Sequence, residues 1–194
     1  MRPSDSDTIA AVATGSGGAI ALIRVSGNEA LAVCDKIFMA ADGNPLAVSE
    51  GYRMHFGTII DKASGEIVDE VIASVFRTPR SYTGEDMVEI SCHASSYIKQ
   101  RILSLLIQSG ARHAQAGEFT VRAFLAGKMD LSQAEAVADI ISSDDRASHS
   151  IAINQMRGGY SDEFVHLRSE LVRLASLLEP ELDFGEEDVF FADR

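Results

Sequence analysis

The 194-residue sequence contains no tryptophan and only two cysteines, Cys34 and Cys92. A disulfide framework needs more cysteines, and a zinc site needs thiols and histidines at close spacing, whereas the histidines here are scattered. Both cysteines lie in apolar stretches. We therefore expect two reduced, buried thiols and no metal site.

Long apolar runs are also missing. No apolar stretch reaches the roughly 18 residues that a transmembrane helix requires. The first seven residues, Met-Arg-Pro-Ser-Asp-Ser-Asp, lack the apolar core of a signal peptide. The sequence thus predicts a cytoplasmic protein without a membrane partner.

Basic residues are scarce, since 17 lysines and arginines face 29 acidic residues and the net charge is −12. Nucleic-acid binding usually leaves a basic footprint, because affinity comes largely from contacts to phosphates. If the protein serves RNA chemistry, we expect the main RNA-binding contacts to lie outside this chain.

Nucleotide-binding motifs are absent as well. The chain has no G-x-x-x-x-G-K-S/T sequence, and its one Gly-Lys pair, Gly127-Lys128, is followed by methionine. The glycine-rich turn at 15–18 lacks the dinucleotide fingerprint. We expect no GTP hydrolysis by this chain alone, and we assign no catalytic residue.

Residues 1–117 alternate between strand and helix patterns, which predicts an α+β domain with a mixed sheet and flanking helices. The two small apolar runs around the turn at 15–18 favour a hairpin or two closely packed strands. The expected strands are 8–14, 19–25, 52–60, 67–76, 87–92 and 111–114, and the expected helices are 28–38 and one that begins at Ser95 or Ser96 and ends before Gly110.

Residues 118–194 are predicted to be helical and to form a second domain. A capping box is expected at Asp130 or at Ser132, since both are followed three residues later by glutamine or glutamate. The last long helix carries an apolar seam, and Pro180 is expected to kink or end it. A seam of this kind needs other helices to cover it, so we expect an incomplete all-α bundle. The seam consists of Tyr160, Phe164, Leu167, Leu171, Leu174 and Leu178.

Two segments are not explained by composition. The first, residues 81–93, places Glu89 on a strand whose neighbours Val88 and Ile90 point to the opposite face. A carboxylate fixed on a strand suits recognition of paired N–H donors, although an exposed or salt-bridged glutamate is the simpler interpretation. His93, as a lone histidine, is interpreted as structural.

The second segment, residues 117–136, is predicted to be a short helix, a stop at Gly127 and a second capped helix. Lys128 lies at the joint between the two helices, where its side chain is able to reach back over the α+β domain.

These segments resemble the signature stretches of the MnmE/TrmE family of tRNA-modifying GTPases. Members carry Ser-Phe/Tyr-Thr-Gly-Glu-Asp and then an apolar-flanked glutamate, as at 81–89 here. Later they carry a Gly-Glu-Phe segment followed by Arg-Ala-Phe-Leu and Asp-Leu-Ser/Thr-Gln-Ala-Glu-Ala, as at 117–136. Residues 7–14 and 23–27 also match, and the resemblance covers essentially the whole chain.

The resemblance implies a dimerising first domain similar to the tetrahydrofolate-binding domain of aminomethyltransferases. It implies that this domain holds a reduced folate, either 5-formyl- or 5,10-methylene-tetrahydrofolate. The family's folate contacts map onto Arg24, Glu89 and Lys128. We expect Glu89 to accept the exocyclic amine and ring N–H of the pterin, and Arg24 and Lys128 to meet the tail carboxylates and the ring carbonyl.

For the whole protein, the resemblance implies a G domain inserted in the helical domain and lying beyond residue 194. That domain would use GTP, magnesium and potassium. Members act with the FAD-dependent protein MnmG (GidA) on the wobble uridine of certain tRNAs and add an aminomethyl or carboxymethylaminomethyl group. Folate supplies the one-carbon unit.

The sequence departs from the family pattern in its glycine-rich loops. Its turn at 14–18 is shorter than the family's, His93 is followed by Ala-Ser rather than Gly-Gly, and alanines stand at 116 and 126 in place of proline and asparagine. Two other functions are therefore considered: a free-standing folate-dependent enzyme resembling the aminomethyltransferases, and a dimerisation scaffold that binds no ligand.

Overall fold

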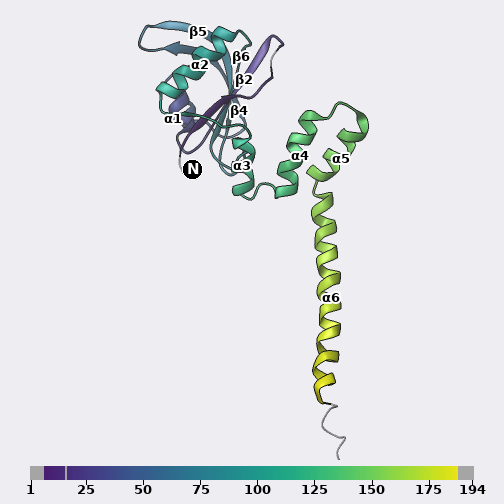
Figure 1. Cartoon of the computed structure of the whole chain (residues 1–194). Coiled ribbons are helices and arrows are strands. Elements are labelled where there is room, and N and C mark those ends of the chain that lie inside the picture. Colours follow the sequence, from purple (N-terminus) through teal and green to yellow (C-terminus); the bar gives the residue numbers. More distant parts are fainter. Residues whose placement is uncertain (1–6, 16, 188–194) are drawn as a thin grey trace, which may run out of the picture. The chain divides into compact units, whose positions relative to one another are not determined.

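The computed structural model describes residues 7–15 and 17–187. Contacts divide the chain into two compact units, residues 1–129 and 130–194 (Figure 1). The sequence placed this division after residue 117. Helix α3 (Glu118–Leu125) falls in the first unit instead, because its charged side chains bind other parts of that unit. No helix within the described ranges is long and apolar enough to cross a membrane.

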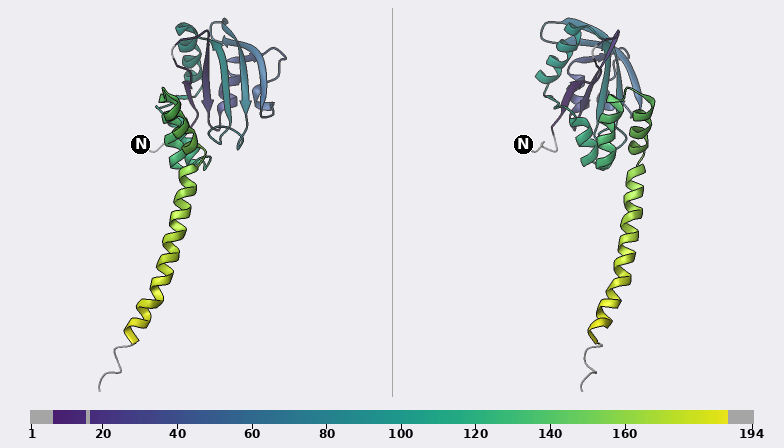
Figure 2. Two further views of the ribbon diagram at one scale, coloured as in Figure 1. Left: turned by 90° about the vertical axis from the view of Figure 1, so that its right-hand side faces the viewer. Right: turned by 45° about the vertical axis from the view of Figure 1, so that its right-hand side comes forward.

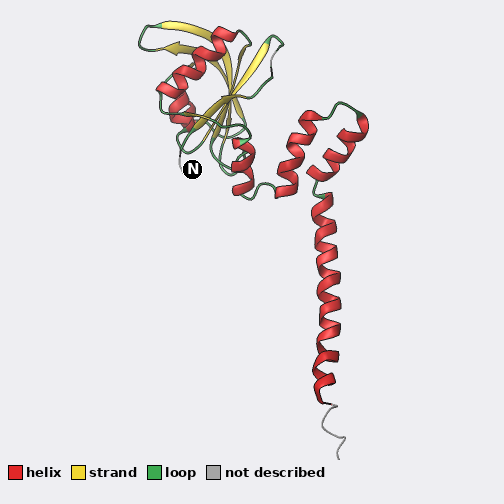
Figure 3. Cartoon of the chain, in the orientation of Figure 1, coloured by secondary structure: helices red, strands yellow, loops and turns green. Residues whose placement is uncertain are grey.

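The first unit is built on a mixed seven-stranded sheet with the order β3-β4-β5-β6-β2-β1-β7 (Figures 2 and 3). Neighbouring strands are antiparallel except β1 and β7, which run parallel. The α+β class expected from the sequence is therefore confirmed. The strands are β1 (Ile9–Val12), β2 (Ile20–Ser26), β3 (Phe38–Ala40), β4 (Arg53–Asp61), β5 (Glu66–Phe76), β6 (Met87–His93) and β7 (Arg112–His113).

Two helices, α1 (Ala30–Asp35) and α2 (Ser96–Gln108), supply the apolar side chains that bury one face of the sheet. The 3-10 helix η1 (Leu46–Val48) packs beside α1. Both cysteines are free and buried in this core, as expected. Burial raises the pKa of both thiols, that of Cys92 to about 11, so neither thiol is poised to react at neutral pH.

Strand alternation leaves the other face of the sheet more open. Val88 and Ile90 on β6 are fully buried towards α1 and α2, and Glu89 between them is only partly buried. Ile23 and Val25 on β2 enclose Arg24 in the same way. Arg24 and Glu89 therefore share the face that the two helices do not cover.

The helix expected at 28–38 is shorter than predicted, because the chain turns into β3 at Phe38. Phe38 pairs with Ile59 of β4, and the Ile37 carbonyl accepts a hydrogen bond from the Ile60 N–H. Burial and pairing in the sheet outweigh the helical spacing of these residues.

The second unit contains α4 (Leu131–Ser142), α5 (Arg146–Met156) and α6 (Gly159–Glu187). The capping box at Asp130 is confirmed. The first turn of α4 contacts the last turn of α5, where the Gln133 side-chain amide donates to the Met156 carbonyl. Helix α6 continues past Pro180, where the sequence predicted a kink or an end.

The predicted apolar seam of α6 lies exposed where its side chains are described. Its described members are Phe164, Leu167, Leu171 and Leu174, and the side chains of Tyr160 and Leu178 lie outside the described ones. A helix whose seam is exposed depends on further packing for its stability.

Candidate functional site

Arg24 and Glu89 face each other across the pairing of β2 and β6. The Arg24 Nε donates to Glu89 Oε1 at 2.8 Å, and Nη2 lies 2.7 Å from the same oxygen. Their side chains are 21% and 17% exposed. Within the described residues, no hydrogen bond reaches Glu89 Oε2. The pair is thus largely sheltered from water but keeps one carboxylate oxygen for another donor.

Two aromatic rings lie against the guanidinium of Arg24. Its central carbon is 4.9 Å from the ring centre of Tyr82 and 5.4 Å from that of Phe119. The Tyr82 hydroxyl is within 2.8 Å of the Thr120 hydroxyl oxygen. Cation–π contacts of this kind fix the plane of an arginine. We call Arg24, Glu89, Tyr82 and Phe119 the Arg24 site.

Lys128 belongs to the first unit, but its contacts are with the 77–86 loop and not with the Arg24–Glu89 pair. Its Nζ donates to the Pro79 carbonyl at 2.9 Å. Its aliphatic stem passes so close to Gly84 that a Cβ there would be 3.5 Å from the Lys128 Cγ. Because Tyr82 lies on this same loop, Lys128 contacts the segment that carries part of the Arg24 site.

A cluster of charged side chains, which we call the buried ion network, lies beside the Arg24 site. Arg112 donates to Asp7 and Glu118, each at 2.7 Å, and Arg122 contacts both of these acids as well. Arg122 also lies 3.1 Å from Glu85. The network joins Asp7, two residues before β1, to the 77–86 loop, β7 and α3.

The electrostatics of the network follow from this pairing. Hydrogen bonds from Arg112 hold the pKa values of Asp7 and Glu118 below their usual range. Burial opposes the charge of Arg122, yet Glu85 and Asp7 outweigh it, and the pKa of Arg122 is raised. Asp7, Glu118 and Arg122 are therefore charged at neutral pH.

The first unit is expected to lose stability when the pH falls below the ordinary carboxyl pKa values, 4.5 for glutamate and 3.8 for aspartate. A carboxyl group with a lowered pKa stabilises the fold fully above its unfolded value, and this contribution disappears as the pH drops through the folded value. Urea unfolding at a series of acidic pH values measures the free energy of unfolding. This free energy should fall less steeply with decreasing pH for Glu118→Gln than for the unchanged chain. An identical dependence in both would contradict the pairing.

The sequence singled out the two segments that form this site but missed most of the residues that complete it. Tyr82 and Glu85 lie in the first segment, and Phe119 and Arg122 lie in the second. Their shared signal was that both segments combine aromatic and charged residues within a few positions. His93, interpreted from the sequence as structural, contacts Asp69, and its ring Nδ1 lies 2.8 Å from Asp69 Oδ1.

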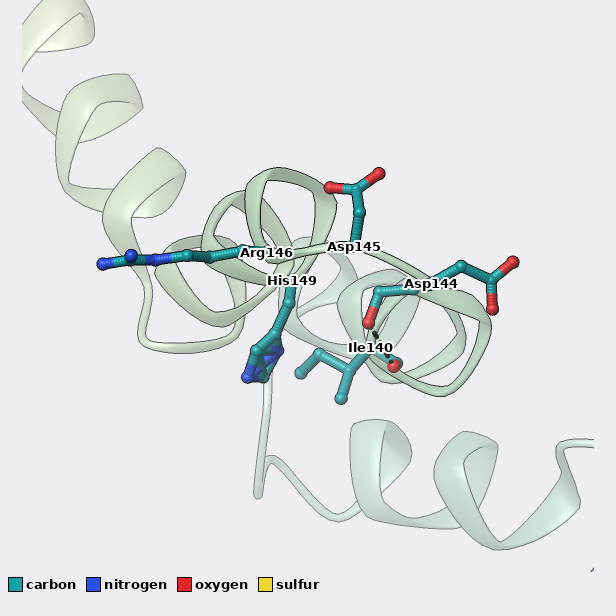
Figure 4. Close-up of a pocket in the computed structure, with 6 residues that line it drawn as sticks. Ile140, Asp144, Asp145, Arg146 and His149 are labelled. Atoms are coloured by element: carbon teal, nitrogen blue, oxygen red, sulfur yellow. Dashed lines mark hydrogen bonds between the residues drawn. The ribbon is translucent and has the colours of Figure 1, made fainter.

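A hollow lies in the second unit, at the turn between α4 and α5 (Figure 4). Its charged side chains point in different directions and do not converge on one point. No cluster suited to a metal ion occurs among the residues that the structure describes. The lining residues are Ile140, Ser143, Asp144, Asp145, Arg146 and His149. The Arg24 site is therefore the better candidate.

Comparison with known families defines the class of protein. A family model described as GTP-binding protein TrmE N-terminus matches residues 8–128, and a model of the MnmE helical domain matches residues 131–194. The chain belongs to the MnmE/TrmE family and carries its N-terminal and helical domains.

Several relatives share this sequence at high identity. A protein named tRNA modification GTPase MnmE from Flavobacterium johnsoniae is 58% identical over 97% of this chain. Proteins with the same name from Bacteroides thetaiotaomicron and Cytophaga hutchinsonii are 56% and 53% identical over 97% of the chain. The chain spans about 40% of the length of these relatives.

Proposed function

We propose that this chain is the folate-binding and dimerising part of a tRNA-modification GTPase. The observation that carries the proposal is the sheltered Arg24–Glu89 pair, stacked against Tyr82 and Phe119 on the open face of the sheet. It lies at the positions where the family resemblance places folate contacts. A likeness to the tetrahydrofolate-binding domain of aminomethyltransferases is part of the same proposal.

The residues fit a reduced pterin in their chemistry. Glu89 keeps Oε2 for an N–H of the ring system while Oε1 holds Arg24. Arg24 has further N–H groups for a ring carbonyl or a tail carboxylate, and the rings beside it offer flat apolar surface. Lys128 would serve an anionic tail by exchanging its Pro79 contact for a carboxylate.

The rest of the proposed activity concerns the whole protein. The relatives extend well beyond the length of this chain, and we assign GTP hydrolysis with magnesium and potassium to a further domain. The chain itself carries no P-loop sequence. The whole protein would act in the cytoplasm with the FAD protein MnmG (GidA) on the wobble uridine of certain tRNAs, with 5-formyl- or 5,10-methylene-tetrahydrofolate as the one-carbon source.

Isothermal titration of this chain with 5-formyltetrahydrofolate tests the proposal. We expect saturable binding of one ligand per chain, and sedimentation at rising protein concentration should reveal a dimer. A dimer without saturable binding at millimolar ligand would support the ligand-free scaffold and overturn the folate-binding function. Saturable binding by a strict monomer would overturn the dimerisation.

A further inference from the structure

We propose that Arg122 is a positioning residue that holds Tyr82 and Phe119 in place around Arg24 and thereby sets the affinity for the pterin. This inference rests on the proposed folate-binding function. Arg122 does not contact the Arg24–Glu89 pair itself. It acts through the two segments that carry the rings.

The fork of Arg122 binds two other parts of the first unit, at Asp7 and Glu85, and Glu118 on its own helix α3. Nη1 donates to the Asp7 carbonyl at 2.8 Å and to both carboxylate oxygens of Glu85 at 3.1 and 3.2 Å. Nη2 donates to Asp7 Oδ1 at 2.5 Å and to Glu118 Oε1 at 3.3 Å. A planar guanidinium with several donors is able to join these parts at once.

The first route from Arg122 to the Arg24 site runs through the 77–86 loop. Glu85 accepts a hydrogen bond from the Ser26 hydroxyl at 2.7 Å, and that hydroxyl is within 2.7 Å of the Thr83 hydroxyl. Thr83 is completely buried and directly follows Tyr82. Fixing Glu85 therefore fixes the base of the loop from which the Tyr82 ring projects.

The second route runs along α3. Phe119 lies three positions before Arg122, about one helical turn away. The Tyr82 hydroxyl meets Thr120 on the same helix. Holding α3 by its arginine thus sets the position of one ring directly and braces the other.

The cost of burying Arg122 argues for a positioning role. Its side chain is 7% exposed, and its Nε is buried without a hydrogen-bond partner among residues 7–15 and 17–187. A buried N–H without a partner costs folding free energy, and Arg122 carries that cost while its fork joins the 77–86 loop to α3.

The first test needs no ligand and uses the whole chain with Arg122→Lys, which keeps the charge but loses the fork. The NMR resonance of the Arg24 Nε–H group reports the ring currents of its two aromatic neighbours. We expect that resonance to shift in Arg122→Lys and to stay in place in the control Arg101→Lys, which alters a part-buried pair between Arg101 of α2 and Asp61 of β4. An unmoved Arg24 resonance in a folded Arg122→Lys chain overturns the proposal.

The second test measures affinity for 5-formyltetrahydrofolate. We expect Arg122→Lys to weaken binding about tenfold, as the loss of an ordered ring contact would. In a background with Tyr82→Leu and Phe119→Leu, the same substitution should have almost no further effect, because the groups it positions are gone. A full tenfold loss in that background would show a general structural role and overturn the proposal.

The two tests separate a failure of this inference from a failure of the folate-binding function on which it rests. If the unchanged chain binds no folate, the folate-binding function fails, and the pterin-affinity part of this proposal fails with it. The Arg24 resonance still decides whether Arg122 positions the rings. If Arg122→Lys does not fold, Glu85→Gln tests the loop route with the same resonance, and an unmoved resonance there counts against the proposal.

Discussion

Replacing Glu89 with glutamine is expected to weaken the binding of 5-formyltetrahydrofolate by about a hundredfold, the loss expected for a charge-assisted hydrogen bond in a sheltered site. Glutamine keeps the size of the side chain and leaves an oxygen for Arg24. It replaces the second carboxylate oxygen with an NH₂ group, which donates and so opposes the N–H donors of a pterin. Titration calorimetry measures the change directly.

The sign of this effect is informative because the ligand is an anion and the chain carries a net charge of −12. Removing a negative charge favours an anion through long-range electrostatics, so a loss of affinity can only come from the local contact. Asp69→Asn is the matched control, since it also removes one negative charge from the same sheet, at a carboxylate that is hydrogen-bonded to His93. Equal affinities for Glu89→Gln and the unchanged chain would remove the case for Glu89 as a folate contact.

Local patterns in the sequence were enough to predict much of the sheet and the position of Glu89. Strict alternation around Val88 and Ile90 forces the residue between them onto the opposite face. The glycine-rich turn likewise predicts the pairing of β1 and β2, in which Ile9 lies opposite Ser26. These features depend on residues that are neighbours in the chain or join at a short turn.

Features that depend on distant residues could not be predicted in this way. Arg122 meets Asp7 at a sequence separation of 115, and no local pattern indicates such a pair. The premature end of α1 at Asp35 also depends on a distant partner, because Phe38 leaves the helical spacing to pair with β4. Assigning α3 to the first unit required the same long-range contacts. The folate contacts themselves stay predictions.

Gly27→Ala is expected to lower the free energy of unfolding of the first unit by about 3 kcal/mol, which is the sum of backbone strain and overpacking. Gly27 has a φ of +137°, and a Cβ there would lie 2.7 Å from the Asp7 carbonyl oxygen and from the Thr8 Cα. These are backbone atoms that cannot turn aside. The same Asp7 carbonyl accepts a hydrogen bond from Arg122, so moving it to relieve the clash also disturbs the buried ion network.

Two further glycines separate the causes of this loss. Gly65 has a φ of +76° but open space around its Cβ position, so Gly65→Ala should cost only the strain, about 1 kcal/mol. Gly15 has open space around its Cβ position and a φ outside the left-handed region, so Gly15→Ala should change the free energy of unfolding little. Urea unfolding followed by near-ultraviolet circular dichroism suits this series, because three of the four tyrosines lie in the first unit and the chain has no tryptophan. If Gly27→Ala lowered the free energy of unfolding by no more than Gly65→Ala does, that result would show that the contact of Gly27 with Asp7 and Thr8 is not rigid. The ion network, which includes Asp7, could then not hold Arg122 in a fixed position.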